Sequence, residues 1–207
     1  MERIEVKRKT TESEMSVVLD FSSLKTNYRE NIDTGITFLN HMIEHIAWRS
    51  GVNVECNVKL DKFQLSHVIC EDLGIALGKA VAEYIKRMAD KGIMGYGDAY
   101  AIIDEARAHS LLSFEERSYF SLEYNGVDMT DMVEGMYKED LETFLLGFSQ
   151  GANCTLQISL EKGENGHHIW EAIFRSFGQA IFETFKTNPL RVGKTAGVAG
   201  KIEWIVD

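Results

Sequence analysis

Apolar and polar positions alternate in two segments that lie 100 residues apart. The segments "VNVECNVKL" (52–60) and "ANCTLQISL" (152–160) show the period of two that is typical of half-buried strands. After a turn, each segment is followed by apolar residues three or four positions apart, which predicts a helix with one buried stripe. The stripe residues are Ile69, Leu73, Leu77, Ala80 and Tyr84 in the first helix, and Ile169, Ile173, Phe177 and Ala180 in the second.

The same patterns predict two further helices and two further strand regions. Helices are predicted at 38–51 and 140–151, just before the two strands. Runs with strand character stand at 15–21 and 108–124, where they open each half of the chain. Each half therefore has a strand region, a helix, a strand and a second helix, in that order.

The two halves are also similar residue by residue. Between positions 51–86 and 151–186, eleven of the 36 aligned residues are identical, where about two would match from average residue usage. The matches are Gly51/Gly151, Asn53/Asn153, Leu60/Leu160, Lys62/Lys162, His67/His167, Ile69/Ile169, Glu71/Glu171, Gly78/Gly178, Ala80/Ala180, Glu83/Glu183 and Lys86/Lys186. We therefore expect an internal duplication: an α+β fold of sheets packed on helices, in one domain (1–207) with halves 1–98 and 99–207.

Composition and charge narrow the class of protein. The formal net charge of −10 provides no basic excess to neutralise phosphates, so we expect no nucleic-acid partner. No apolar run approaches the roughly 18 residues that would span a bilayer, and the N-terminus is charged from the start, so we expect no membrane partner and no export. Three cysteines without CxxC spacing indicate free thiols, and hence a cytoplasmic protein.

Candidate chemistry lies at the start of the two duplicated helices. The second helix opens with "HHIWE" (167–171), and the first with "HVICE" (67–71). Residues four apart share a helix face, whereas adjacent residues diverge by about 100°. His167 and His168 therefore suit two metal ions better than one. A histidine–carboxylate set favours Mn, Fe, Zn, Co or Ni. The alternative is that the histidines cap a helix and Glu171 interacts with its dipole.

Six motifs resemble, in order, the signature of the imidazoleglycerol-phosphate dehydratase family. They are "RKTTES" (8–13), "TGITFLNHM" (34–42), "HVICEDLGIALG" (67–78), "GIMGYGD" (92–98), "DEARAHSLLSFEERSY" (104–119) and "GENGHHIWEAIF" (163–174). The resemblance covers nearly the whole chain. It implies a duplicated α+β fold, a homo-oligomer in the form of a trimer-based cage, and two manganese sites at subunit interfaces. It also implies dehydration of a small phosphorylated, imidazole-containing substrate in histidine biosynthesis.

The resemblance implies a set of metal ligands of which most are present. These are His41, His67, Glu71, His167, His168 and Glu171. Two positions depart from the family, since Val68 and Thr143 stand where it has histidines. By the pseudo-symmetry of the halves, we expect each metal to lose one ligand. His45 lies four residues after His41 on the same helix face, which makes it a candidate replacement ligand.

The resemblance also assigns substrate contacts and proton transfer. Glu12 matches a glutamate that meets the substrate, and Arg117 matches a phosphate-binding arginine. A second such arginine falls on Gly95, and a closing serine–lysine pair falls within "AGVAG" (196–200). The candidate substitutes are Lys201, Lys194 and Arg191. The carboxylates that could serve in catalysis are Glu12, Glu71 and Glu171.

Three hypotheses follow for the function, of which ordinary activity in histidine biosynthesis is the least compatible with Val68, Thr143 and Gly95. The first is a divergent metal-dependent carbon–oxygen lyase that keeps a remodelled metal centre. The second is a non-catalytic homologue that acts as a cage-forming scaffold or as a binding subunit.

Overall fold

Two four-stranded sheets with the same strand order form the outer layers of the structure. The computed structural model describes residues 2–200, 202–203 and 205. The first sheet has the order β1-β2-β4-β3 and the second β5-β6-β10-β7. The strands of the first are β1 (Arg3–Lys9), β2 (Ser13–Asp20), β3 (Ile32–Asp33) and β4 (Asn53–Leu60). Those of the second are β5 (Tyr96–Ile103), β6 (Ala106–Ser113), β7 (Tyr119–Glu123) and β10 (Thr155–Lys162).

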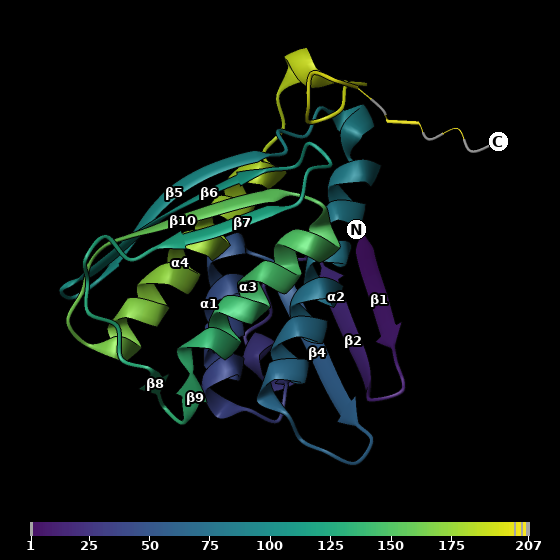
Figure 1. The fold of residues 1–207 in the computed structure, drawn as a ribbon. Coiled ribbons are helices and arrows are strands. Elements are labelled where there is room, and N and C mark those ends of the chain that lie inside the picture. Colours follow the sequence, from purple (N-terminus) through teal and green to yellow (C-terminus); the bar gives the residue numbers. More distant parts are fainter. Residues whose placement is uncertain (1, 201, 204, 206–207) are drawn as a thin grey trace.

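The pairing directions repeat as well as the order. In each sheet the first two pairs are antiparallel, and the last pair, β3 with β4 or β7 with β10, is parallel. Figure 1 shows the α-helices of the described chain lying between the two sheets. They are α1 (Thr37–Ser50), α2 (Ser66–Arg87), α3 (Lys138–Ala152) and α4 (Gly166–Phe185). The expected duplication of an α+β half is confirmed.

The remaining elements are short. A small hairpin, β8 (Met132–Val133) with β9 (Met136–Tyr137), precedes α3. Single 3-10 turns occupy Tyr28–Asn31, Ala89–Lys91 and Pro189–Arg191. No helix in the described part of the chain has the length and apolar character that crossing a bilayer requires. All three cysteines are buried free thiols, as their number and spacing predicted.

The predicted strand region 108–124 is wrong in one respect, because it contains two strands. β6 ends at Ser113, and β7 begins at Tyr119. Between them lies the charged sequence "EER", where Glu116 has a φ of 59°. That backbone conformation ends a strand. Both strands pair with β10, one on each side. The outer strands β1 and β5 were not predicted.

Capping residues mark the ends of three of the helices. The side chain of Asn165 accepts hydrogen bonds from the backbone N–H groups of His167 and His168, and so caps α4 at its N-terminus. Gly51 and Asn153 follow α1 and α3 with left-handed backbones, at φ 70° and 49°. Because each helix then leads directly into β4 or β10, the helix is fixed relative to its sheet.

Candidate metal centre

The helices of one half pack against the helices of the other. α1 lies along α4, and α2 lies along α3. Gly178 permits the first contact: a Cβ atom at this position would lie 2.9 Å from the Cα of Ile46 and 3.0 Å from the Cβ of Arg49. The first turns of α1 and α4 also lie side by side, since the rings of Phe38 and His167 have centroids 5.3 Å apart. His41 of the first half therefore meets the second histidine motif, and not the first.

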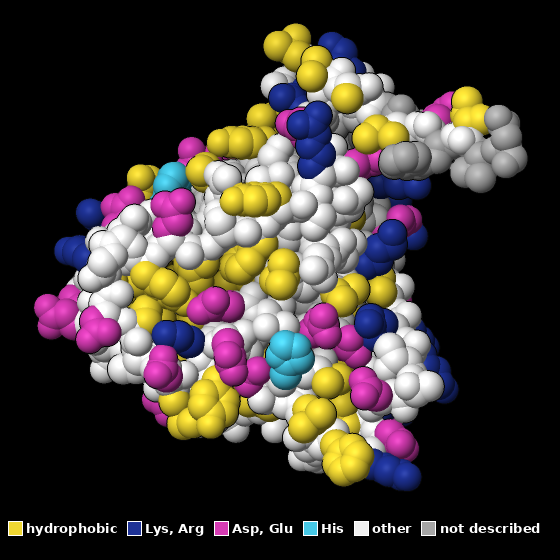
Figure 2. Space-filling model, viewed as in Figure 1, with side chains coloured by type: hydrophobic (Ala, Val, Ile, Leu, Met, Phe, Trp, Pro, Cys, Tyr) yellow, Lys and Arg dark blue, Asp and Glu magenta, His cyan; other side chains and the backbone are white. Residues whose placement is uncertain are grey.

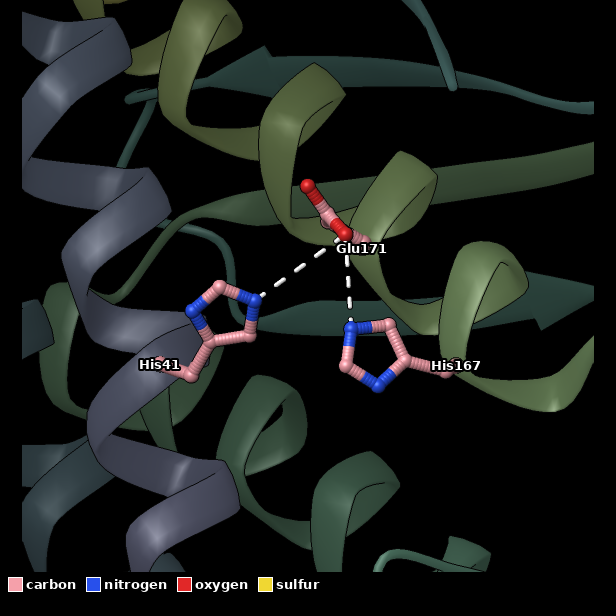
Figure 3. A group of neighbouring side chains, drawn as sticks. All are labelled: His41, His167 and Glu171. Carbon is pink, nitrogen blue, oxygen red and sulfur yellow. Dashed lines mark ion pairs between the residues drawn. The ribbon is translucent and has the colours of Figure 1, made fainter. Parts of the chain in front are cut away.

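Three side chains converge at this helix contact (Figure 3). The Nε2 atom of His41 lies 3.9 Å from Oε2 of Glu171, and the Nε2 atom of His167 lies 3.5 Å from the same oxygen. One potential ligand atom from each residue lies within 4.8 Å of the other two. Such spacing fits a single divalent ion held by two imidazoles and a carboxylate. Three of the six residues expected as metal ligands, His41, His167 and Glu171, thus lie together within one chain.

Glu171 is buried, with 5% of its surface exposed, yet its carboxylate is well supported. Its Oε1 atom contacts the guanidinium of Arg175, one helical turn later, and lies 3.0 Å from Nε2 of His45. Because these contacts occupy Oε1, Oε2 remains directed at His41 and His167. A carboxylate oxygen placed in this way beside two imidazoles can serve as a metal ligand.

His45 borders the three-residue group. Its Nε2 atom lies 3.3 Å from Nε2 of His41. Burial, followed by the neighbouring charges of His41 and Arg175, lowers the pKa of His45 from 6.5 to about 3. The ring is therefore neutral at physiological pH, which is the form that a metal ligand requires.

His168 points away from this group, as adjacent helical positions predict. Its ring is nearly perpendicular to that of His167, and the ring centroids are 6.2 Å apart. Its Nδ1 atom lies 2.9 Å from Glu105, in the β5–β6 turn, and its Nε2 atom lies 3.8 Å from Asp104. A hydrogen bond from the backbone of Asn165, then one from His168, lowers the pKa of Glu105 to about 2. The bond to Glu105 in turn raises the pKa of His168.

The first motif does not form a comparable group within one chain. His67 is exposed on α2, and its Nδ1 atom lies 3.8 Å from Asp140 of α3. Glu71 is half-buried one turn later. In the described residues, the groups with three ligand atoms within 4.8 Å are His41–His167–Glu171 and Asp104–Glu105–His168. Figure 2 shows acidic side chains gathered on the surface over the start of α2 and α3.

The residues expected to meet the substrate lie apart from the centre. Glu12 lies in the β1–β2 turn, where its carbonyl accepts a hydrogen bond from the backbone N–H of Asp61. Arg117 is exposed between β6 and β7. Lys201 falls outside the described residues. Neither Glu12 nor Arg117 contacts His41, His167 or Glu171 within one chain.

A cleft of about 560 Å³ opens beside the centre, large enough for a small molecule. It is lined by Arg29, Ile32, Thr37, Phe38, Asn40, His41, Glu44, Glu134 and His167. Two candidate ligands therefore face a space that a substrate could occupy.

Sequence reasoning missed several charged neighbours of the histidines. Glu44 lies 3.3 Å from Nδ1 of His41, and Glu134, in the β8–β9 turn, lies 3.1 Å from Nδ1 of His167. Glu44 is three residues from His41 on its helix, and Arg175 is four residues from Glu171. Side chains at these spacings lie together on a helix, so the sequence could have predicted both contacts. Glu134 is 33 residues from its histidine and has no local signal.

Fold and site together define a class: a duplicated α+β protein with histidine and carboxylate ligands at the start of its helices. The family model for imidazoleglycerol-phosphate dehydratase matches residues 34–181. The chain belongs to this family.

Relatives support the assignment over nearly the whole chain. The chain is 36% identical over 204 residues to imidazoleglycerol-phosphate dehydratase from Thioalkalivibrio sulfidiphilus (strain HL-EbGR7), which covers 97% of this chain and 99% of that protein. It is 34% identical over 202 residues to the enzyme from Ralstonia pickettii (strain 12J), with 97% and 98% covered. The crystal structure of the Pyrococcus furiosus enzyme in complex with (S)-C348 matches with a TM-score of 0.77 at 26% identity, covering 95% and 99%.

Proposed function

We propose that this chain is a metal-dependent carbon–oxygen lyase that dehydrates imidazoleglycerol phosphate or a closely related phosphorylated imidazole. The observation that carries the proposal is the convergence of His41, His167 and Glu171 beside the cleft. Imidazole nitrogen and carboxylate oxygen are suitable ligands for manganese and for iron, zinc, cobalt and nickel. Membership of the family supports the reaction type.

The chain's own residues divide the chemistry between them. A bound divalent ion would supply the Lewis acidity that stabilises charge developing on an imidazole ring. Glu171 is engaged by Arg175 and His45, so its role is to hold the ion rather than to move a proton. Glu12 and Glu71 form no ion pair among the described residues, and one of them is left to carry the proton from the substrate.

His45 is proposed as an additional ligand of this ion. To bind it through Nε2, which faces Oε1 of Glu171 at 3.0 Å, the ring would exchange its hydrogen bond to Glu171 for the ion. We expect His45→Gln to weaken manganese binding by about tenfold or more, because the glutamine amide still donates to Glu171 but offers no imidazole nitrogen. Calorimetric titration with Mn²⁺ measures the effect. The control is His109→Gln, since His109 stacks on Tyr100 on the second sheet, away from the centre. Unchanged affinity in His45→Gln would mean that His45 only donates to Glu171.

A second copy of the chain is proposed to complete the active site. His67, His168 and Arg117 carry site chemistry in the family but lie away from the His41 centre within one chain. Neighbouring subunits of a homo-oligomer, as in a trimer-based cage, would bring such residues together at their interfaces. The cytoplasm is the proposed location.

One observation favours the alternative, a non-catalytic scaffold or binding subunit. Gly95 stands where the family has a phosphate-binding arginine, and its backbone has a φ of 60°. A Cβ atom there would lie only 2.3 Å from the Cβ of Ala196. Uncharged residues thus fill a place where a phosphate contact is expected. Together with Val68 and Thr143, this loss predicts turnover well below that of an intact family enzyme.

Metal content and turnover distinguish the two functions. The full chain is purified without chelator, its manganese content per chain is measured by elemental analysis before and after loading, and loss of water from imidazoleglycerol phosphate is followed by mass spectrometry. We expect stoichiometric metal and slow, metal-dependent dehydration. Protein that stays metal-free after loading would refute the lyase proposal and favour the scaffold.

A further inference from the structure

His45 turns its Nε2 atom toward Glu171, at 3.0 Å, but three other histidines near the start of α1 and α4 share a different arrangement. In each of them a carboxylate oxygen faces Nδ1. The distances are 3.3 Å from Glu44 to His41, 3.1 Å from Glu134 to His167, and 2.9 Å from Glu105 to His168. The three carboxylates come from α1, the β8–β9 turn and the β5–β6 turn, so one local motif does not explain the pattern.

Two of these carboxylates are themselves held in place. Glu44 contacts the guanidinium of Arg29 and accepts a hydrogen bond of 3.2 Å from the hydroxyl of Tyr28. Glu105 accepts backbone hydrogen bonds of 2.8 Å from Asn165 and 3.3 Å from Glu164 through its other oxygen. Anchoring of this kind fixes a carboxylate before any ligand arrives.

The third carboxylate sits in an unusual backbone conformation. Glu134 has a φ of 48° in the two-residue turn between β8 and β9 and is followed by Gly135, at φ 81°. Non-glycine residues are uncommon in this region, and asparagine or aspartate adopts it more readily than glutamate. Glutamate stands here nonetheless, and its carboxylate reaches Nδ1 of His167 from this turn.

Another histidine shows the opposite arrangement. His109 lies on the outer face of the second sheet, where its ring stacks on Tyr100 at 4.0 Å between centroids. Its Nε2 atom, and not Nδ1, lies 2.6 Å from Asp98. A neighbouring carboxylate can therefore face either ring nitrogen of a histidine. The repeated contact between a carboxylate and Nδ1 at the candidate site needs an explanation.

An ionised carboxylate is only a hydrogen-bond acceptor, so the nitrogen that faces it carries the proton. A neutral ring with a proton on Nδ1 leaves the lone pair on Nε2 free. In His41 and His167 that nitrogen faces Glu171, at 3.9 and 3.5 Å. We propose that Glu44, Glu134 and Glu105 are positioning residues that hold these histidines in the tautomer whose Nε2 is free for a divalent cation.

This inference deepens the proposed function and rests on its metal centre, but its first test needs no metal. Nitrogen-15 NMR of metal-free, histidine-labelled protein reports which ring nitrogen carries the proton. We expect wild-type His167 to show the Nδ1–H tautomer. In Glu134→Gln the amide can donate to Nδ1, so the population should shift toward Nε2–H. Asp131→Asn, next to the same hairpin and paired with Lys138, is the matched control and should leave His167 unchanged.

Titration of the same variants with Mn²⁺ is the second readout. Glu134→Gln should bind manganese about 10–100-fold more weakly than wild type, as altered orientation of a ligand predicts, and Asp131→Asn should match wild type. An unchanged tautomer and unchanged affinity in folded Glu134→Gln would overturn the positioning role. A wild-type chain that has the Nδ1–H tautomer but binds no manganese would instead refute the proposed function and leave the positioning role standing.

Discussion

Glu171→Gln is expected to reduce manganese affinity by more than about 100-fold and to abolish metal-dependent dehydration. The change removes the charged ligand. It also leaves Arg175 and His45, which both contact this carboxylate, without a carboxylate partner. Arg175 loses its ion pair, and the new amide group directs its hydrogens at either the guanidinium or the imidazoles. Calorimetric titration and the electron paramagnetic resonance spectrum of bound Mn²⁺ measure the loss.

Stability has to be followed in the same experiment, because removal of one partner from a buried ion pair costs about 3–5 kcal/mol. Glu171→Asp keeps the charge and separates loss of a ligand from loss of the fold. Glu183→Gln, three turns further along α4 and paired with Lys186, is the surface control and should change stability by less than about 0.5 kcal/mol. Wild-type manganese binding by Glu171→Gln would rule out the His41–His167–Glu171 group as the metal centre.

The sequence predicted the members of this centre but not their grouping. Periodicity shows that a helix has an apolar stripe. It does not show which other helix covers that stripe, because any second apolar stripe could pack against it equally well. Whether His41 meets the first or the second histidine motif depends on which helices pair. The pairing of α1 with α4 includes the close approach of Gly178 to Ile46, a contact between positions that are 132 residues apart (178 − 46).

The fold was easier to predict than the site, because the duplication is visible in the sequence itself. Identical residues at a fixed offset predicted equivalent strands and helices, and both sheets have the same order. The outer strands β1 and β5 escaped prediction. In β1 only Ile4 is fully buried, and the charged residues around it weaken the apolar signal. Carboxylates such as Glu134 escaped because no period links a turn residue to a histidine on a distant helix.

Gly78→Ala is expected to destabilise the protein by about 2–3 kcal/mol, although it places a better helix former within α2. Its Cβ atom would lie 2.2 Å from the carbonyl oxygen of Phe148 and 2.8 Å from the backbone nitrogen of Ala152. Both neighbours are backbone atoms of α3 and have no rotamer to change. The gain of about 1 kcal/mol in helix propensity is therefore outweighed by the separation of two packed helices. Urea unfolding measures the difference.

The backbones of α2 and α3 approach each other closely at several points along their contact, so these two helices have little freedom to adjust. A Cβ atom at Gly74 would lie 2.2 Å from the carbonyl oxygen of Phe144, and one at Gly151 of α3 would lie 2.0 Å from that of Ile75. The control is Lys79→Ala, on the exposed face of α2 beside Gly78, which should change stability by less than about 0.5 kcal/mol. Equal stability of Gly78→Ala and wild type would mean that α2 and α3 can separate freely.

Folded Gly78→Ala should still bind manganese at the His41 centre within about twofold of wild type, because that centre lies between α1 and α4. The duplicated glycine thus acts at a different helix contact in each half, and only Gly178 should control the metal centre.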